Sequence, residues 1–163
     1  MDSMFNDLIE PISMAIQPVA GPPGIRRSNL LVVIEDEPSL SHQLGPICDF
    51  LGIGIQAIPS AEHLGLVLDE YRPLAVIAPF ESVYQDGGHV LKSVAIHDAT
   101  LPVMILTDRN ATYIGAVDAM VGLLNLTSVQ TPNGDPGMGE LVDFLARAGQ
   151  HARCRRITRV NRD

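Results

Sequence analysis

The stretch "LLVVIEDEPSLSHQLGPICDFLG", residues 30–52, decides the fold because it joins two periodicities in one unit. Residues 30–34 form a continuous aliphatic run, which is typical of a parallel strand buried on both faces. Leu40, Leu44 and Ile47 then recur at helical spacing. The stretch therefore predicts a buried strand followed by a helix.

The same strand-helix unit recurs further along the chain. Apolar runs suited to strands, each followed by a helical pattern, occupy 53–58 with 60–71, 74–78 with 87–98, 102–107 with 111–124, and 126–130 with 137–149. Right-handed crossovers between parallel strands leave few arrangements for five such units. We predict an α/β fold with a doubly wound, five-stranded parallel sheet in three layers, flavodoxin-like or Rossmann-like, whose last helix ends at Gly149.

Composition shifts divide the chain into four parts. Residues 17–29, rich in Pro and Gly, read as a linker. Ahead of the linker, residues 1–16 have apolar residues at helical spacing and three acids, and Pro11 should kink this amphipathic arm. The βα units predict one domain over 30–149. Residues 150–163 follow as a basic tail, and six of the eleven Lys and Arg lie in the last 17 residues.

Charge and cysteine content narrow the function classes. A formal net charge of −8 argues against non-specific DNA binding, and the 14 residues after Gly149 are too few for a DNA-binding domain. Two cysteines make no disulfide framework. The sequence shows neither an apolar run long enough to span a membrane nor the charged start of a secretory signal. We expect a cytoplasmic protein.

An acidic pair, Glu35 and Asp36, follows the first predicted strand, at the end of the sheet where α/β proteins bind ligands. Two adjacent carboxylates repel each other unless they are solvated or bridged by a cation such as Mg²⁺. Alternatively, the acids open the first helix, where the helix dipole favours them, with Pro38 in the first turn. The sequence leaves both interpretations open.

The order of these features resembles the receiver domain of bacterial two-component response regulators over residues 30–149. The matching features are "VIEDEP" at the first strand, "DGG" at 86–88 after the third, and Thr107 ending the fourth. In that family the acidic pair binds Mg²⁺ and an aspartate ending the third strand accepts a phosphoryl group. The resemblance also implies that Thr107 contacts a phosphoryl oxygen and that a lysine ending the fifth strand neutralises charge.

The chain departs from this pattern at the residues that carry the chemistry. Pro79 occupies the place of the acceptor aspartate, and Thr131 occupies that of the lysine. Asp108 stands where the family usually has a small residue, and Ser128 where it keeps an aromatic switch. Phosphoryl transfer needs the nucleophile and cations that offset negative charge. We therefore predict a pseudo-receiver that is no enzyme, with a vestigial site and no cofactor beyond weak or absent Mg²⁺ binding at Glu35 and Asp36, where Asp108 replaces part of the missing carboxylate.

Two other carboxylates are candidate acceptors in place of Pro79. Glu81 lies two residues later, and Asp86 lies deeper in the loop. Moving Glu81 into the acceptor position would break the strand pattern of 74–79, so we do not expect either residue to restore the reaction.

We expect the protein to act by binding other proteins, either a signalling partner or a second copy in a homodimer. Family receivers dock through the fourth helix, and here that helix has apolar residues beyond one stripe. The candidate contact residues are Phe5, Leu8, Ile9 and Ile12 of the arm and Ile114, Val117, Met120 and Val121 of the fourth helix. The arm should pack on its own domain or on a partner. The alternatives are a sensor of a nucleotide second messenger and, less favoured, a conventional phosphorylated regulator.

Overall fold

The computed structural model describes residues 29–82 and 85–162. The arm and nearly all of the linker, with the predicted contact residues Phe5, Leu8, Ile9 and Ile12, lie outside these ranges.

Five parallel strands form the central sheet in the order β2-β1-β3-β6-β7. The strands are β1 (Leu30–Ile34), β2 (Gly54–Ile58), β3 (Ala75–Pro79), β6 (Val103–Leu106) and β7 (Val129–Gln130). All five residues of β1 are buried, as its aliphatic run predicts. The predicted doubly wound sheet is confirmed, and its strand order reverses beside β1, where the chain turns from β2 towards β3.

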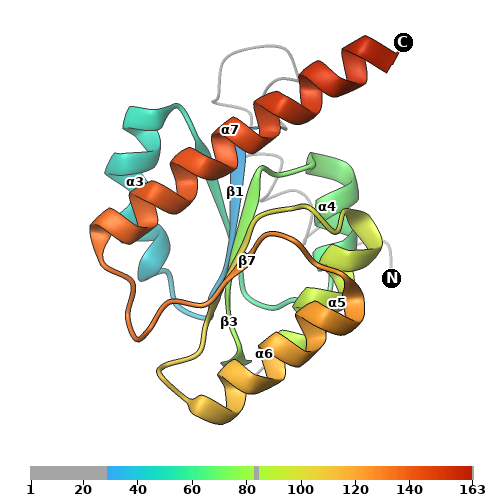
Figure 1. Ribbon diagram of the computed structural model, residues 1–163. Helices are drawn as coiled ribbons and strands as arrows, with labels where there is room; N and C mark the ends of the chain where they lie inside the picture. Colours follow the sequence, from blue (N-terminus) through green and yellow to red (C-terminus); the bar gives the residue numbers. More distant parts are fainter. Residues whose placement is uncertain (1–28, 83–84, 163) are drawn as a thin grey trace, which may run out of the picture.

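Helices cover both faces of this sheet (Figure 1). They are α3 (Leu40–Leu51), α4 (Leu64–Tyr71), α5 (Gly87–His97), α6 (Ala111–Leu124) and α7 (Met138–Arg162). Alternate residues of β1 enter two separate cores. Val32 and Ile34 pack with residues of α4, α5 and α6, whereas Leu31 and Val33 pack with residues of α3 and α7.

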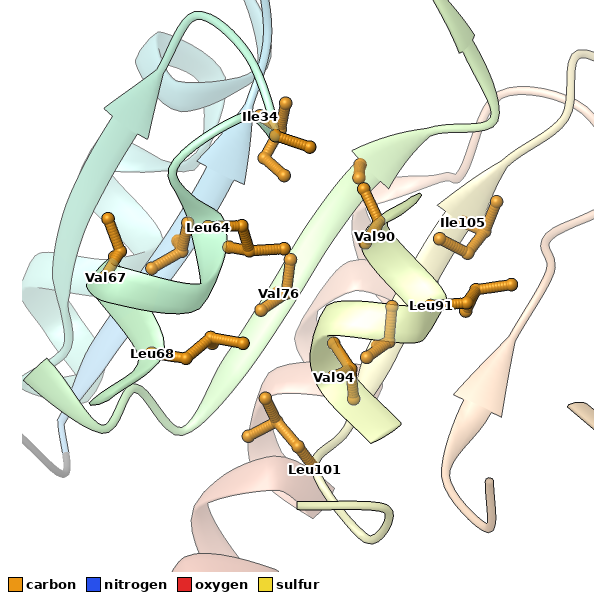
Figure 2. Close-up of a cluster of buried hydrophobic side chains, with 14 of the residues drawn as sticks. Ile34, Leu64, Val67, Leu68, Val76, Val90, Leu91, Val94, Leu101 and Ile105 are labelled. Carbon is orange, nitrogen blue, oxygen red and sulfur yellow. The ribbon is translucent and has the colours of Figure 1, made fainter. Parts of the chain in front are cut away.

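The core beneath α4, α5 and α6 is mostly aliphatic, with Tyr71 as its buried aromatic residue. Figure 2 shows Leu64 and Leu68 of α4 and Val90 of α5 meeting side chains of β1, β3 and β6. Burying such side chains contributes roughly 1.5 to 3 kcal/mol each. The sheet is therefore a rigid platform for the loops at its two ends.

The last helix is longer than predicted. Gly149 lies inside α7, which continues to Arg162, so residues 150–162 are helix and not a separate tail. Gly149 has open space around it, and Ala148 and Ala152 on either side are both buried. Packing thus carries the helix past the glycine, and arginines near its end suit the helix dipole.

A small hairpin replaces the loop predicted after the third strand. Strands β4 (Glu81–Ser82) and β5 (Gln85–Asp86) pair antiparallel directly before α5. Among the described helices, none is both long and apolar enough to cross a membrane.

Candidate functional site

The predicted site residues follow the carboxyl ends of β1, β3, β6 and β7, which meet at one end of the sheet. Pro79 pairs with Leu106, so it lies beside the residue before Thr107. The fold thus brings the region of Glu35, Pro79, Thr107 and Thr131 to one end, as the sequence predicts. We call this the carboxyl end of the sheet.

Glu35 caps the first helix of the domain. Its Oε2 accepts a hydrogen bond from Leu40 N at 3.0 Å. Its Oε1 accepts from Ser41 N at 3.1 Å and from Ser41 Oγ at 2.5 Å. These bonds satisfy backbone donors that a helix start leaves unpaired. Helix α3 begins at Leu40 after the N-cap Ser39, so Pro38 precedes the helix and does not lie in its first turn.

The donor set at the carboxyl end does not fit a magnesium site. Both oxygens of Glu35 are engaged by α3, while Asp36 and Asp108 are exposed. Within residues 29–82 and 85–162, no group of three or more His, Cys, Asp or Glu side chains is placed to hold a metal ion. Mg²⁺ prefers an octahedron of oxygens, and these two exposed carboxylates belong to no group of three or more such ligands among the described residues.

Phe80 directly follows Pro79, the residue in the predicted acceptor position, and is held by hydrogen bonding and packing. Its backbone N–H extends the β3–β6 pairing by donating to Leu106 O at 2.8 Å. Its ring lies 4.8 Å from the ring of Tyr113 on α6, tilted by 34°. The aromatic pair joins the end of β3 to the start of α6, and Phe80 packs on the core. The residue that follows Pro79 is therefore fixed by its contacts with β6, α6 and the core.

Gly87 is required by this packing. Its N–H donates to Phe80 O at 2.7 Å. A Cβ at Gly87 would lie 2.8 Å from that oxygen and 2.9 Å from Phe80 Cα. The "DGG" that matches the family pattern thus holds a glycine because the hairpin and α5 meet the backbone of Phe80 closely.

The two alternative acceptor residues pair with each other through their backbones in the hairpin. Glu81 pairs with Asp86 across β4 and β5, which form a sheet separate from the main one. Neither residue continues β3 in the place of Pro79. The backbone therefore gives no support to a shifted acceptor.

Thr107 is buried without a partner for its hydroxyl. The residue is 1% exposed, and Oγ1 has no hydrogen-bond partner among the described residues. The two following residues, Asp108 and Arg109, have φ values of 52° and 61°. Such left-handed conformations are costly for residues with a Cβ. Asn110 then caps α6 by accepting from Tyr113 N at 3.1 Å.

Arg109 brings a cation towards the loop after β7. A Cβ on Gly134 would collide with Arg109 Nε, so the arginine side chain packs against this glycine. Thr131, in the lysine position, begins the same loop. The sequence gave no signal of this contact.

Helix α6 buries more of the predicted contact residues than expected. Val117 is 1% exposed and belongs to the core, so it cannot contact a partner. Met120 and Val121 are partly buried and pack against the same core, and Ile114 is half-buried. Leu123, which the sequence did not single out, is 81% exposed.

Cys48 is no candidate nucleophile. The side chain is buried in α3, and desolvation together with nearby Asp49 raises the pKa of the thiol to about 11. At neutral pH the thiol is protonated, and a thiol is a far weaker nucleophile than a thiolate.

A hollow of about 360 Å³ lies between the edge strand β7 and α7, and no sequence pattern predicted it. Its lining residues are Pro102, Thr127, Ser128, Val129, Gln130, Phe144, Arg147, Ala148 and His151. Pro102, Thr127 and Ser128 precede β6 and β7, which places the hollow towards the amino end of the sheet. The one signal in the sequence was Ser128, a small residue where an aromatic one is expected.

No protein-family model matches the chain, and a search of curated proteins found no match. Solved structures do match. The solution structure of the beryllofluoride-activated NtrC receiver domain is 20% identical, with a TM-score of 0.59, covering 77% of this chain and 96% of that one. The crystal structure of an adenylate cyclase from Rhodopirellula baltica is 10% identical, with a TM-score of 0.63, covering 81% and 95%.

A third match has a metal in its site. The receiver domain of a sensor histidine kinase from Pseudomonas aeruginosa, with magnesium coordinated in its active-site cleft, is 14% identical. Its TM-score is 0.58, and the match covers 76% of this chain and 98% of that one. At these identities the comparison shows the fold alone, and the conclusion is that the chain has the flavodoxin-like fold of response regulator receiver domains.

Proposed function

We propose that this protein is a pseudo-receiver, an interaction module for signalling that has lost phosphorylation and catalyses no reaction of its own. The observation that carries the proposal is Pro79 at the end of β3, in the position where family receivers have the acceptor aspartate. Proline has no side-chain oxygen, so it cannot form an acyl phosphate. The other features of the carboxyl end agree with this interpretation.

The surroundings of Pro79 lack what a phosphoryl group needs. Glu35 is engaged in capping α3, and Thr131 offers no positive charge. Exposed Asp108 adds a negative charge at the same end of the sheet. Because phosphoryl transfer depends on cations around the transferred group, these changes remove the reaction together.

The test is mass spectrometry of the full chain incubated with acetyl phosphate and Mg²⁺. We expect no gain in mass. A receiver of known activity, treated in parallel, shows that the phosphodonor is competent. Gain of one acid-labile phosphoryl group at any carboxylate, including Glu81 or Asp86, would overturn the proposal.

Exposed apolar side chains on adjacent helices supply a contact surface for a signalling protein or a second copy. Leu123 on α6 is 81% exposed and Ile96 on α5 is 88% exposed. These helices pack side by side on the same face of the sheet. Two such side chains on neighbouring helices are candidates for a protein contact if they form one patch.

Sedimentation of the full chain tests this surface. Leu123→Asp should weaken self-association or partner binding while circular dichroism stays unchanged. Phe50→Asp is the matched control, because Phe50 is 89% exposed but lies on α3, across the sheet. Equal effects of both variants would show that the surface of α5 and α6 is not the contact.

A further inference from the structure

The hollow between β7 and α7 is lined by buried apolar side chains and by one exposed cation, Arg147. Phe144 and Ala148 are only 3% and 1% exposed. Arg147 Nε donates to Asp143 O at 3.4 Å, and no carboxylate of the described residues pairs with its guanidinium. His151 Nε2 lies 3.3 Å from Thr100 Oγ1. Arg147 therefore offers an unpaired positive charge to an acidic occupant.

One side of the hollow is an unpaired strand edge. Among the described residues, strand β7 pairs with β6 alone and has no strand on its other side. Exposed strand edges are usually covered, because their backbone groups attract other chains. Helix α7 leaves the hollow between itself and this edge.

The sequence contains one segment with the complementary chemistry. Residues 1–16 have apolar residues at helical spacing, acids at Asp2, Asp7 and Glu10, and no basic residue. From Arg147 onward, α7 has six arginines, so its second half is strongly positive. The acidic arm and the cationic helix attract each other in a protein of otherwise negative charge.

The connection between arm and domain permits the arm to reach the hollow. The linker enters β1 at the amino end of the sheet, and His151 contacts Thr100 in the loop that enters β6 at the same end. Three strand spacings separate β1 from β7, or roughly 15 Å at about 4.8 Å each. A linker of 13 residues can span roughly 40 Å. The linker is therefore long enough for the arm to reach the hollow.

We propose that residues 1–16 of the same chain dock over the hollow between β7 and α7, with their acids beside Arg147. A short linker holds the arm at an effective concentration of about millimolar, which favours its own domain over a second copy. The docked arm covers the edge of β7, so a partner that needs this edge must displace it. This inference does not depend on whether the carboxyl end has lost phosphorylation.

Cross-linking of the full chain tests the proposal directly. Cysteines are introduced by Leu8→Cys and Ser128→Cys in a Cys154→Ser background, and a short bismaleimide is added. Cys48 stays unreactive because it is buried and its pKa is about 11. We expect a link between positions 8 and 128 within one chain, identified by mass spectrometry of the monomer band.

A second pair of introduced cysteines measures the background rate of cross-linking. Leu8→Cys with Glu62→Cys places the second thiol at an exposed position in the loop after β2, at the other end of the sheet. This pair should link at least about tenfold more slowly, since the docked arm is held away from it. Equal rates for the two pairs would overturn the proposal, and so would a link between two chains.

Charge reversal tests the ionic part. Arg147→Glu should slow the link between positions 8 and 128 by about fivefold, because an attraction becomes a repulsion, whereas Arg147→Lys should leave it nearly unchanged. Hydrogen exchange gives a readout free of added thiols. Ser128→Phe, which fills the hollow, should speed exchange of residues 4–12. No change in that exchange would also overturn the proposal.

Discussion

The two ends of the parallel sheet differ in how their side chains are used. At the carboxyl end, side chains at the ends of β1 and β3 serve capping and packing: Glu35 caps α3, and Phe80 stacks with Tyr113. At the amino end, the short strand β7 and the long helix α7 leave a hollow that Arg147 lines without a carboxylate partner among the described residues. The comparison teaches that one end of a sheet can use its side chains for structure while the other end leaves a charged group without a partner.

The comparison predicts that removing capping or packing groups at the carboxyl end reduces stability, and that substitutions at the amino end reduce binding. Four substitutions follow, in order from the largest to the smallest expected effect on the free energy of unfolding. In each, the free energy is measured by urea denaturation at equilibrium.

The largest effect is expected for Gly87→Ala. The new Cβ would lie within 3 Å of backbone atoms of Phe80, so the hairpin or α5 must shift, at a cost of about 1 to 3 kcal/mol. Gly115→Ala is the control, because no atom lies within 4 Å of its position in α6. That substitution should raise stability by up to about 1 kcal/mol. A harmless Gly87→Ala would show that the carboxyl end is less tightly packed than we describe.

Glu35→Ala should cost about 1 kcal/mol, because the first turn of α3 loses the acceptor for Leu40 N and Ser41 N. Asp36→Ala, at the exposed neighbouring carboxylate, should change stability little. The two variants also test whether the acidic pair binds Mg²⁺. If the acidic pair is structural, addition of Mg²⁺ leaves the stability of the parent and of both variants unchanged, whereas a stabilisation that Asp36→Ala abolishes would contradict this assignment.

Thr107→Val should be neutral or stabilise the protein by up to about 1 kcal/mol. The hydroxyl is buried without a partner among the described residues, so removing it relieves a desolvation cost while the side-chain volume is kept. Thr107→Ala provides the reference for lost volume and should destabilise. A clear loss of stability in Thr107→Val would mean that the hydroxyl has a bonding partner in solution, which would reopen the carboxyl end as a binding site.

The smallest effect is expected at the amino end. Arg147→Ala should change the free energy of unfolding by less than about 0.5 kcal/mol, because the side chain is exposed and its one hydrogen bond is to the backbone of its own helix. A loss as large as that of Glu35→Ala would break the comparison, since it would make Arg147 a structural residue too.

Much of the fold was predictable, because buried parallel strands need continuous apolar runs such as 30–34 and 74–78. The boundaries of the helices were less predictable. Gly149 is a good local stop signal, yet α7 continues to Arg162, because the flanking alanines pack on the domain. The role of Glu35 was left between two interpretations. Its capping bonds to Leu40 and Ser41 depend on the path of the loop between them, which periodicity does not specify.

By itself the sequence determined the α/β class and the order of the elements, because these follow from residue identity and local period. Only the tertiary structure decided which apolar residues of α6 are core and which are surface. Val117 and Leu123 lie on the same apolar helix, but one faces the sheet and the other faces solvent. It alone also decided that β7 and α7 leave a hollow between them, because the space between two elements depends on the packing of residues that are distant in the sequence.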